Sequence, residues 1–283
     1  MIDRPRGRFH VRLSGPENAP VVVLLHGWPE SSYCWSGVAA ALPDKYRLVM
    51  PDLRGLGDSP RTLDDSAYTK QALATDMLAL LDALGIDRCA LVGHDWGGAV
   101  AQEMALARPE RVRRLVLLNI HALPNARGNA AAQQTLSEHG AQSLWYQFFQ
   151  AAPELPEAMI PGNESVWLGH FLRTWSRRGF PSDAFDEYVR CYAIPDTPAT
   201  GAAYYRCYRQ DTARWAELAG TRFAMPGLYI HGRHDPVIIP AFTQYLEDVF
   251  DSVRLESLDA AHFVQEERPA EVAALIDDFL AGD

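Results

Sequence analysis

The stretch G-H-D-W-G-G (Gly93–Gly98) decides how this sequence folds. It lies between an apolar run, Cys89–Gly93, that predicts a buried strand and a helical pattern over Gly97–Ala107. The small residues on both sides of the central aspartate suit a tight turn, because such a turn leaves little room around its middle side chain. The first amide groups of the following helix would point toward Asp95. The stretch therefore predicts a strand–turn–helix unit with Asp95 as a candidate nucleophile; the alternative is an ordinary turn aspartate.

The same alternation of strands and helices continues along the chain. Val21–Leu25 and Leu115–Asn119 have the continuous apolar character of strands buried on both faces. Thr69–Leu84 has apolar residues at helical spacing and is followed by Gly85, a typical helix stop. Further expected elements include strands at Phe9–Leu13, Gly227–Ile230 and Val253–Leu258 and helices at Phe242–Phe250 and Ala270–Leu280. This order predicts an α/β fold in which helices cover both faces of a parallel sheet.

The alternation stops between residues 121 and 220. This segment has no comparable apolar strand and instead predicts short helices separated by Pro and Gly. It contains 15 of the 29 aromatic residues of the chain. We therefore expect residues 1–120 and 221–283 to form the core domain and residues 121–220 to form a helical cap. Such a cap would cover the C-terminal edge of the sheet, where open α/β sheets bind ligands.

Composition narrows the function classes. Of the 283 residues, 48% are hydrophobic and 22% charged, as in ordinary globular proteins. The net charge of -10 disfavours nucleic-acid binding. The four cysteines are far apart, which favours buried free thiols over disulfides or a zinc site. No stretch predicts a secretion signal, a membrane span, a metal cluster or a phosphate loop, so we expect a cytoplasmic protein without a cofactor.

Two residues downstream of Asp95 complete a candidate catalytic triad. Asp235 follows the expected strand Gly227–Ile230, and His262 follows the expected strand Val253–Leu258. Because parallel strands end at the same edge of a sheet, both side chains can lie close to Asp95. Asp235 as a turn residue before a proline, and His262 as a surface loop histidine, are the structural alternatives.

Three motifs resemble those of one superfamily. H-G-W-P-E (His26–Glu30), D-L-R-G-L-G-D-S (Asp52–Ser59) and the Gly93–Gly98 stretch together resemble the α/β-hydrolase superfamily, and within it the epoxide hydrolase and haloalkane dehalogenase branch. The resemblance covers essentially the whole chain outside the cap. It implies an α/β-hydrolase fold, with a mostly parallel sheet flanked by helices and a helical lid inserted after the sixth strand. It also implies an oxyanion hole made by the backbone N–H groups of Trp28 and Trp96, while Asp52 and Arg54 would brace the surroundings.

An aspartate nucleophile implies hydrolysis in two steps. The carboxylate of Asp95 would attack a saturated carbon and form an alkyl ester. Water activated by His262 would then attack the ester carbonyl, while Asp235 orients the imidazole and stabilises its charged form.

The leaving group separates the two activities of this branch. An epoxide opens to a strongly basic alkoxide and needs proton donors, and the resemblance implies that cap tyrosines supply them. Y-Y-R (Tyr204–Arg206) resembles the cap motif of epoxide hydrolases, which makes Tyr205 one candidate acid. W-Y-Q-F-F-Q (Trp145–Gln150) resembles the other cap segment but looks one residue shorter than the usual pattern, with Tyr146 as the second candidate. Packing within the cap is the alternative role for both tyrosines.

A halide needs only N–H donors. Trp96 suits this role, but Trp28 occupies the position at which dehalogenases often have asparagine, and the cap offers Trp145, Trp167 and Trp175 instead. Fluoroacetate-type dehalogenases have arginine directly after the nucleophile, so Trp96 disfavours a small anionic substrate. Asn119 stands where some dehalogenases have their acid, which leaves Asp235 as the partner of His262.

These observations favour an epoxide hydrolase that acts on an apolar or aryl epoxide with water. Trp96, Trp145 and Phe149 are expected to contact the substrate. The alternatives are a haloalkane dehalogenase with the same triad and a non-catalytic binding protein, which a broken triad would indicate. The sequence leaves open whether the chain forms a homodimer.

Overall fold

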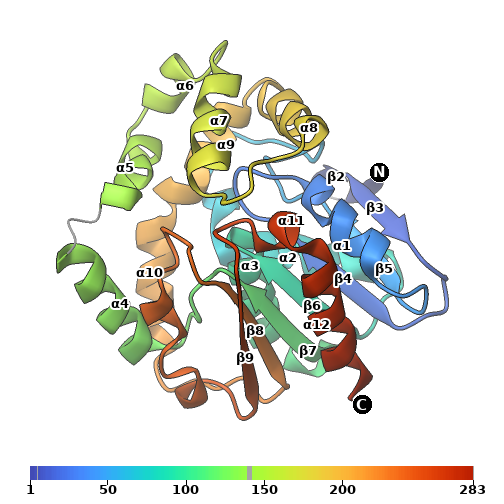
Figure 1. The fold of residues 1–283 in the computed structure, drawn as a ribbon. Coiled ribbons are helices and arrows are strands. Elements are labelled where there is room, and N and C mark those ends of the chain that lie inside the picture. Colours follow the sequence, from blue (N-terminus) through green and yellow to red (C-terminus); the bar gives the residue numbers. More distant parts are fainter. Residues whose placement is uncertain (5, 139–141, 283) are drawn as a thin grey trace.

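The computed structural model describes residues 1–4, 6–138 and 142–282, and its centre is a seven-stranded sheet (Figure 1). The strand order is β3-β5-β4-β6-β7-β8-β9, in which only β3 runs antiparallel to its neighbour. The expected mostly parallel sheet is therefore confirmed. The strands are β1 (Ile2–Arg4), β2 (Gly7–Phe9), β3 (Val11–Ser14), β4 (Val21–Leu25), β5 (Arg47–Pro51), β6 (Cys89–His94), β7 (Val112–Leu118), β8 (Gly227–Gly232) and β9 (Val253–Leu258).

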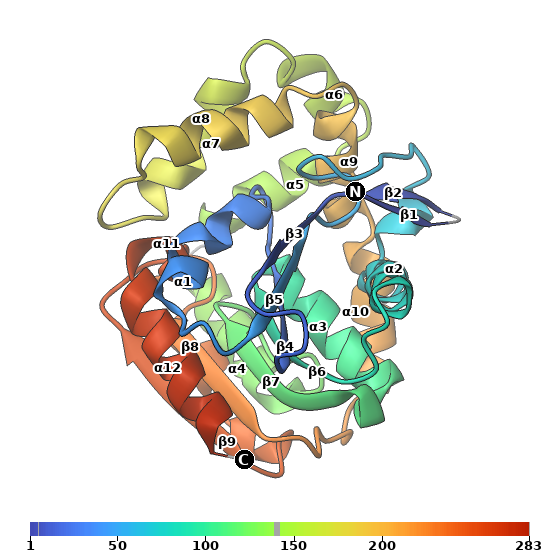
Figure 2. The ribbon, with the colours of Figure 1, turned by 90° about the vertical axis from the view of Figure 1, so that its right-hand side faces the viewer.

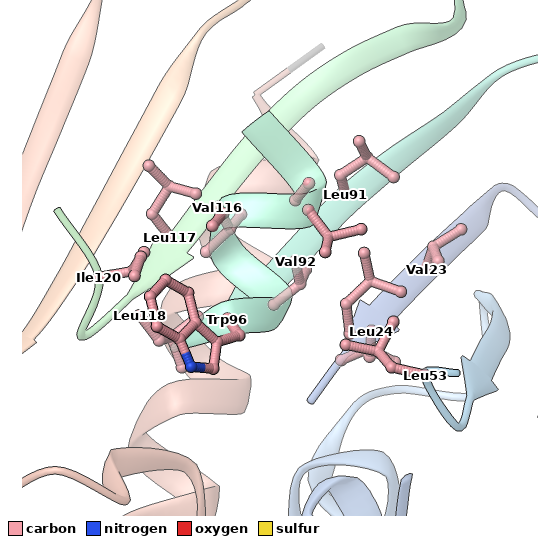
Figure 3. Packing of buried hydrophobic residues seen from close by; sticks show 14 of the residues in the cluster. Val23, Leu24, Leu53, Leu91, Val92, Trp96, Val116, Leu117, Leu118 and Ile120 are labelled. Carbon is pink, nitrogen blue, oxygen red and sulfur yellow. The ribbon is translucent and has the colours of Figure 1, made fainter. Parts of the chain in front are cut away.

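The central strands are buried on both faces, as their continuous apolar sequences predict. All six residues of β6 are buried, and so are the last four of β4. Figure 3 shows side chains of β4, β6 and β7 packed around the start of helix α3, where Trp96 lies; among those of the strands are Val23, Leu24, Leu91, Val92, Val116 and Leu117. This packing fixes the edge of the sheet from which the site residues extend.

Helices cover both faces of the sheet (Figure 2). Helices α1 and α12 pack together on one face, and α2 and α3 pack together on the other. Helix α2 begins where the side chain of Thr69 accepts a hydrogen bond from the Ala72 amide, and it is followed by Gly85 at φ 65°. The bounds are α1 (Ser36–Ala41), α2 (Lys70–Ala83), α3 (Trp96–Ala107), α11 (Val264–Glu267) and α12 (Pro269–Ala281).

The described residues between β7 and β8 form helices and no strand. These helices are α4 (Ala126–Glu138), α5 (Trp145–Ala151), α6 (Leu155–Met159), α7 (Glu164–Thr174), α8 (Ser182–Tyr192), α9 (Thr197–Arg206) and α10 (Tyr208–Glu217). Figure 1 shows α5 to α9 above the end of the sheet from which the catalytic candidates extend. The insertion follows β7, which is the seventh strand along the chain and the fifth strand of the large sheet, rather than the sixth; the first two strands, β1 and β2, form a separate antiparallel pair.

Two expected elements are wrong. The single strand at Phe9–Leu13 is divided at His10, whose imidazole bonds to Asp52, so β2 ends and β3 begins there. The expected helix at Phe242–Phe250 consists instead of two short 3-10 turns, because Tyr245 has a left-handed φ of 60° that interrupts helical geometry.

Two further observations concern the chain as a whole. All four cysteines are free and buried, as expected from their spacing. None of the helices in the described part of the chain combines the length and the apolar character that crossing a bilayer requires.

Candidate active site

Asp95 lies on a strained turn between β6 and α3. Its φ of 48° and ψ of -129° are unusual for a residue with a side chain, a state that costs roughly 1–3 kcal/mol. The turn packs against the end of β4, and a Cβ on Gly97 would lie 2.3 Å from the carbonyl oxygens of Leu25 and His26. Only glycine fits at that position, so the sequence around Asp95 is the one that this tight turn requires.

The two oxygens of the Asp95 carboxylate have different partners. Oδ1 accepts a hydrogen bond of 2.9 Å from the backbone N–H of Trp28. That approach requires Gly27, because a Cβ there would lie 2.4 Å from the Cβ of Asp95. Oδ2 lies 3.7 Å from Nε2 of His262. Trp96 is the first residue of α3, so its amide is among those without an acceptor inside the helix.

Asp235 and His262 form a buried pair beside Asp95. Nδ1 of His262 lies 2.8 Å from Oδ2 of Asp235, whose Oδ1 accepts hydrogen bonds from the amides of Val237 and Ile238. Burial opposes ionisation of Asp235, but the neighbouring imidazole and the two amides outweigh it and lower the pKa of this carboxyl. Burial also disfavours the imidazolium of His262, yet Asp235, through its charge and hydrogen bond, and the charge of Asp95 raise its pKa to about 9. Nε2 of His262 has no hydrogen-bond partner among the described residues.

Two residues that the sequence analysis did not place in the site hold the backbone of His262. The amide of Asn119 donates to the carbonyl oxygens of Ala261 and His262, and its oxygen accepts from the Gly232 amide. Nε2 of His94 lies 2.8 Å from the same His262 carbonyl oxygen. Asn119 therefore ties the loop of Asp235 to the loop of His262 and is no alternative acid. The sequence feature that could have identified His94 as a site residue is its place inside the Gly93–Gly98 motif.

The Asp52–Ser59 loop is held by buried hydrogen bonds of Asp52 and by a buried ion pair of Arg54. Asp52 accepts hydrogen bonds from the amides of Ser32 and Asp58. Although burial opposes its ionisation, a hydrogen bond from His10 and these amides lower the pKa of Asp52 to about 2. Arg54 forms a buried ion pair of 2.6 Å with Asp76. In the described chain, only His10, Asp52 and Asp58 place three groups that could ligate a metal within 4.8 Å of one another.

The two candidate tyrosines lie together over the nucleophile turn. The rings of Tyr146 and Tyr205 are 5.4 Å apart, and both tyrosines are buried. Tyr146 stacks on the indole of Trp28 at 5.7 Å, and Tyr205 meets the indole of Trp96 edge-on at 5.6 Å. Burial is the main cause that raises the pKa of both phenols, and the negative charge of Asp95 adds to it. Both phenols therefore keep their protons at neutral pH.

A cavity of about 610 Å³ opens from Asp95 between the core and the helices that follow β7. Of the three residues expected to contact substrate, Trp96 lines this cavity. Trp145 and Phe149 do not line it: they lie one helical turn apart on the face of α5 that packs against Trp167 of α7. The lining residues are Asp95, Trp96, Ile120, His121, Leu123, Ala126, Asn129, Gln133, Leu136, Leu144, Tyr146, Gln147, Phe148, Tyr208, Thr212, Trp215, Ala216, Val237, Ile238 and Phe242.

Comparison with known proteins matches this arrangement to one family. The sequence profile of the alpha/beta hydrolase fold family matches residues 20–269. The chain belongs to the α/β-hydrolase family. Its resemblance to the epoxide hydrolases is also confirmed, by relatives similar to it over most of their length.

Three of these relatives define how close the similarity is. Epoxide hydrolase A of Mycobacterium tuberculosis is 30% identical over 315 residues, covering 100% of this chain and 97% of the relative. The soluble epoxide hydrolase of Corynebacterium sp. (strain C12) is 33% identical over 255 residues, covering 88% and 85%. The crystal structure of epoxide hydrolase A from Mycobacterium thermoresistibile is 27% identical with a TM-score of 0.83, covering 97% of this chain and 95% of that one. This α/β-hydrolase thus shares its fold with the last of the three over nearly the whole of both chains.

Proposed function

We propose that this α/β-hydrolase is an epoxide hydrolase that opens an apolar epoxide to a diol through an ester on Asp95. One observation carries the proposal: the carboxylate of Asp95 lies between His262 and the Trp28 amide, while the buried rings of Tyr146 and Tyr205 lie 5.4 Å apart and pack on the indoles of Trp28 and Trp96. A nucleophile and two proton donors are what a strained ether needs in order to open. Three named relatives are epoxide hydrolases, which agrees with this chemistry.

In the first step Asp95 opens the ring. Oδ2, the carboxylate oxygen that the Trp28 amide does not bind, attacks a ring carbon, and the C–O bond of the epoxide breaks. The epoxide oxygen takes a proton from Tyr146 or Tyr205 as its charge develops. Oδ1 stays beside the Trp28 amide and becomes the carbonyl oxygen of the ester.

In the second step His262 acts as a base. Its pKa of about 9 keeps the free imidazole largely protonated at neutral pH, and the charge of Asp95 is one cause of that value. Ester formation removes this charge, so the pKa of His262 falls and the neutral imidazole becomes available. The proton that His262 releases restores the phenol that gave its proton to the epoxide oxygen. Water then gives a proton to Nε2 and attacks the ester carbonyl, and the Trp28 and Trp96 amides bind the oxyanion. When this intermediate collapses, the bond between the ester carbon and the substrate oxygen breaks, the imidazolium protonates the departing diol, and the new acid proton of Asp95 passes to His262, which restores the carboxylate. Asp235 stabilises the imidazolium that forms.

Residues 121–220 are proposed to act as the cap that supplies the acids and shapes the substrate pocket. Within the described lining of the cavity, Asp95 is the only acidic residue, and no lysine or arginine lines it. Burial, together with the charge of Lys70, lowers the pKa of the lining residue His121 to about 4, so this imidazole is neutral. Since nothing in that lining balances a carboxylate, we infer an uncharged, largely apolar substrate.

The dehalogenase alternative needs indole N–H groups that are free to bind a halide, and few of the tryptophans in the described residues meet this condition. Nε1 of Trp28 donates to the hydroxyl of Tyr192 at 3.0 Å and is not available to a halide. The ring of Trp175 packs on His262 at 5.1 Å, and Trp145 is exposed on the outside of α5. The indole N–H groups of Trp96 and Trp167 have no partner among the described residues, and of the two only Trp96 lines the cavity. A leaving halide would therefore have one indole donor that lines the cavity. An alkoxide would have the phenol of Tyr146, which lines the cavity, and that of Tyr205, whose ring lies 5.4 Å from it.

A substrate panel tests the proposal. The purified protein is incubated with aryl and alkyl epoxides and with haloalkanes of similar size, while diol and halide are measured. We expect diol formation without halide release. An aryl epoxide that carries a ring carboxylate should react more than about 10-fold more slowly than its uncharged parent, because the carboxylate is buried without a counter-charge. Halide release from simple haloalkanes, with no diol from any epoxide, would overturn the proposal.

Removal of the two phenols tests the acid step. Tyr205→Phe and Tyr146→Phe should each slow ester formation by about 10²- to 10⁴-fold, because each takes a proton donor from the departing oxygen. Single-turnover mixing with mass detection of the ester measures this rate. Tyr33→Phe is the matched control: its hydroxyl bonds to Asp183 at the surface, away from the cavity, and its removal should leave the rate unchanged. A tyrosine whose loss changes the rate less than the control does is not an acid.

A further inference from the structure

A lysine lies fully buried where the cap helices meet the core. Lys70 is the first residue of α2, and the exposed fraction of its side chain is 0%. Its Nζ lies 2.6 Å from the carbonyl oxygen of Tyr204 and 2.9 Å from Oδ2 of Asp211. It also lies 3.9 Å from the centroid of the Trp96 ring. Because a buried ammonium group is costly without partners, these three contacts hold the cation in place.

The contact with Tyr204 lies in the last turn of helix α9. Tyr204 is in the last turn of α9, where carbonyl groups have no amide partner inside the helix, and Lys70 supplies the missing donor. The hydroxyl of Tyr204 is held as well, since it donates to the carbonyl of Arg54 at 2.7 Å. The next residue is Tyr205, so the backbone from which this phenol extends is fixed by Lys70.

The contact with Trp96 reaches the nucleophile turn. The Trp96 ring lies against Nζ of Lys70 and against the ring of Tyr205, and Trp96 directly follows Asp95. Asp211 of α10 in turn fixes Lys70, because its Oδ1 accepts from the Lys70 backbone amide while its Oδ2 pairs with Nζ. Burying such a pair contributes little net stability compared with apolar residues of the same volume. The ion pair of Lys70 and Asp211 therefore matters more for the positions of Tyr204 and Trp96, which Lys70 contacts, than for the free energy of unfolding.

We propose that Lys70 is a positioning residue for ring opening, which sets Tyr205 of the cap against Trp96 and Asp95 of the core. The inference rests on the proposed epoxide hydrolase function and adds a residue that neither the triad nor the oxyanion hole includes. Loss of the cation frees the last turn of α9 and one face of Trp96, so Tyr205 no longer meets the epoxide oxygen reliably. Ester hydrolysis should change little, because Lys70 contacts the indole ring of Trp96 rather than its backbone amide and has no described contact with His262 or Asp235.

The test measures the two steps separately. In a His262→Gln chain, where the ester accumulates, the rate of mass gain is measured after mixing with an aryl epoxide. Lys70→Met with Asp211→Asn removes both charges at nearly constant volume, and we expect it to slow this rate by about 10- to 100-fold, the effect of a displacement of about 1 Å. In the chain with His262 intact, the rate of ester decay should change by less than about 2-fold, because remote sites act independently.

A matched control removes another ion pair between α10 and the core. Arg214 pairs with Glu103 of α3 at 3.1 Å without touching Tyr204 or Trp96. The Arg214→Met, Glu103→Gln chain should form ester within about 2-fold of the parent rate, because its ion pair is independent of Tyr205. Circular dichroism and thermal melting check that each chain folds. If the double variant at Lys70 and Asp211 does not fold, Lys70→Met alone is measured.

Tyr205→Phe distinguishes an effect of Lys70 on the position of Tyr205 from a general loss of order in the structure. If Lys70 acts through Tyr205, the substitutions at Lys70 and Asp211 should slow ester formation by less than about 3-fold in a chain that already lacks this hydroxyl, since the two effects are not additive. Equal slowing with and without the hydroxyl, equal slowing of both steps, or no slowing would overturn the inference. Absence of ester from the His262→Gln parent with every epoxide would overturn the proposed function, and this inference with it.

Discussion

Replacing His262 by glutamine is expected to stop the protein after its first chemical step. The nucleophile, its oxyanion amide and the phenols remain, so Asp95 still opens the epoxide. The ester then persists, because glutamine cannot remove a proton from water as Nε2 of His262 does. Turnover should fall by about 10²- to 10⁴-fold, the usual contribution of a general base. Intact-protein mass spectrometry should show a gain equal to one substrate, and peptide mapping should place it on Asp95.

A neighbouring histidine provides the control. His234 lies near Asp235 in the same loop, is partly exposed and pairs with Asp259 at 3.0 Å outside the site. His234→Gln should keep the turnover of the native protein and accumulate no ester. A His262→Gln chain that turns over substrate at the native rate, or that gains no mass with a substrate the native protein consumes, would refute the covalent mechanism.

The second large effect is expected at Asp95, where activity and stability should separate. Asp95→Ala and Asp95→Gly both remove the nucleophile, so both should lose all measurable turnover and gain no mass from epoxides. They differ in the backbone, because φ 48° and ψ -129° strain alanine but suit glycine. We expect the glycine variant to be the more stable of the two by about 1–2 kcal/mol, although glycine ordinarily costs about 0.5–1 kcal/mol relative to alanine.

Urea unfolding of the two variants measures this difference in the free energy of unfolding. Both have lost the same carboxylate and its hydrogen bond with Trp28, so the comparison isolates the backbone. Ala101→Gly, compared with the native alanine at this buried position in the middle of α3, provides the reference in which glycine should be the less stable. If glycine is less stable than alanine at Asp95 too, the turn stores no strain.

The sequence predicted the sheet and the nucleophile turn because both depend on local chemistry. Continuous apolar runs identified β4 and β6, and β9 has the bounds expected for it, Val253–Leu258. The structure brings Asp95, Asp235 and His262 together, because each follows a parallel strand and parallel strands end at one edge. The Trp28 amide reaches Asp95 for the same reason, since β4 lies beside β6.

The arrangement of the helices between β7 and β8 was less predictable, because each of these helices can turn more than one face toward the site. The spacing of Trp145 and Phe149 places them on one face of α5, but only the packing of α7 decides that this face lies away from the cavity while Phe148 lines it. Lys70 is a similar case. A lysine at the start of a helix usually extends into solvent, and its burial depends on Asp211, 141 residues later in the chain.

The four buried cysteines can report where the molecule opens, because a buried thiol reacts only when its surroundings become accessible. Cys34 and Cys89 lie within the sheet domain, whereas Cys191 and Cys207 lie among the cap helices. Burial raises the pKa of all four thiols, so an alkylating reagent modifies each one only when its surroundings open. Modification of Cys191 and Cys207 would thus report local opening of the helices between β7 and β8, while modification of Cys34 and Cys89 would report opening of the sheet domain. The ratio of the two rates would compare the local stability of these two parts of the molecule.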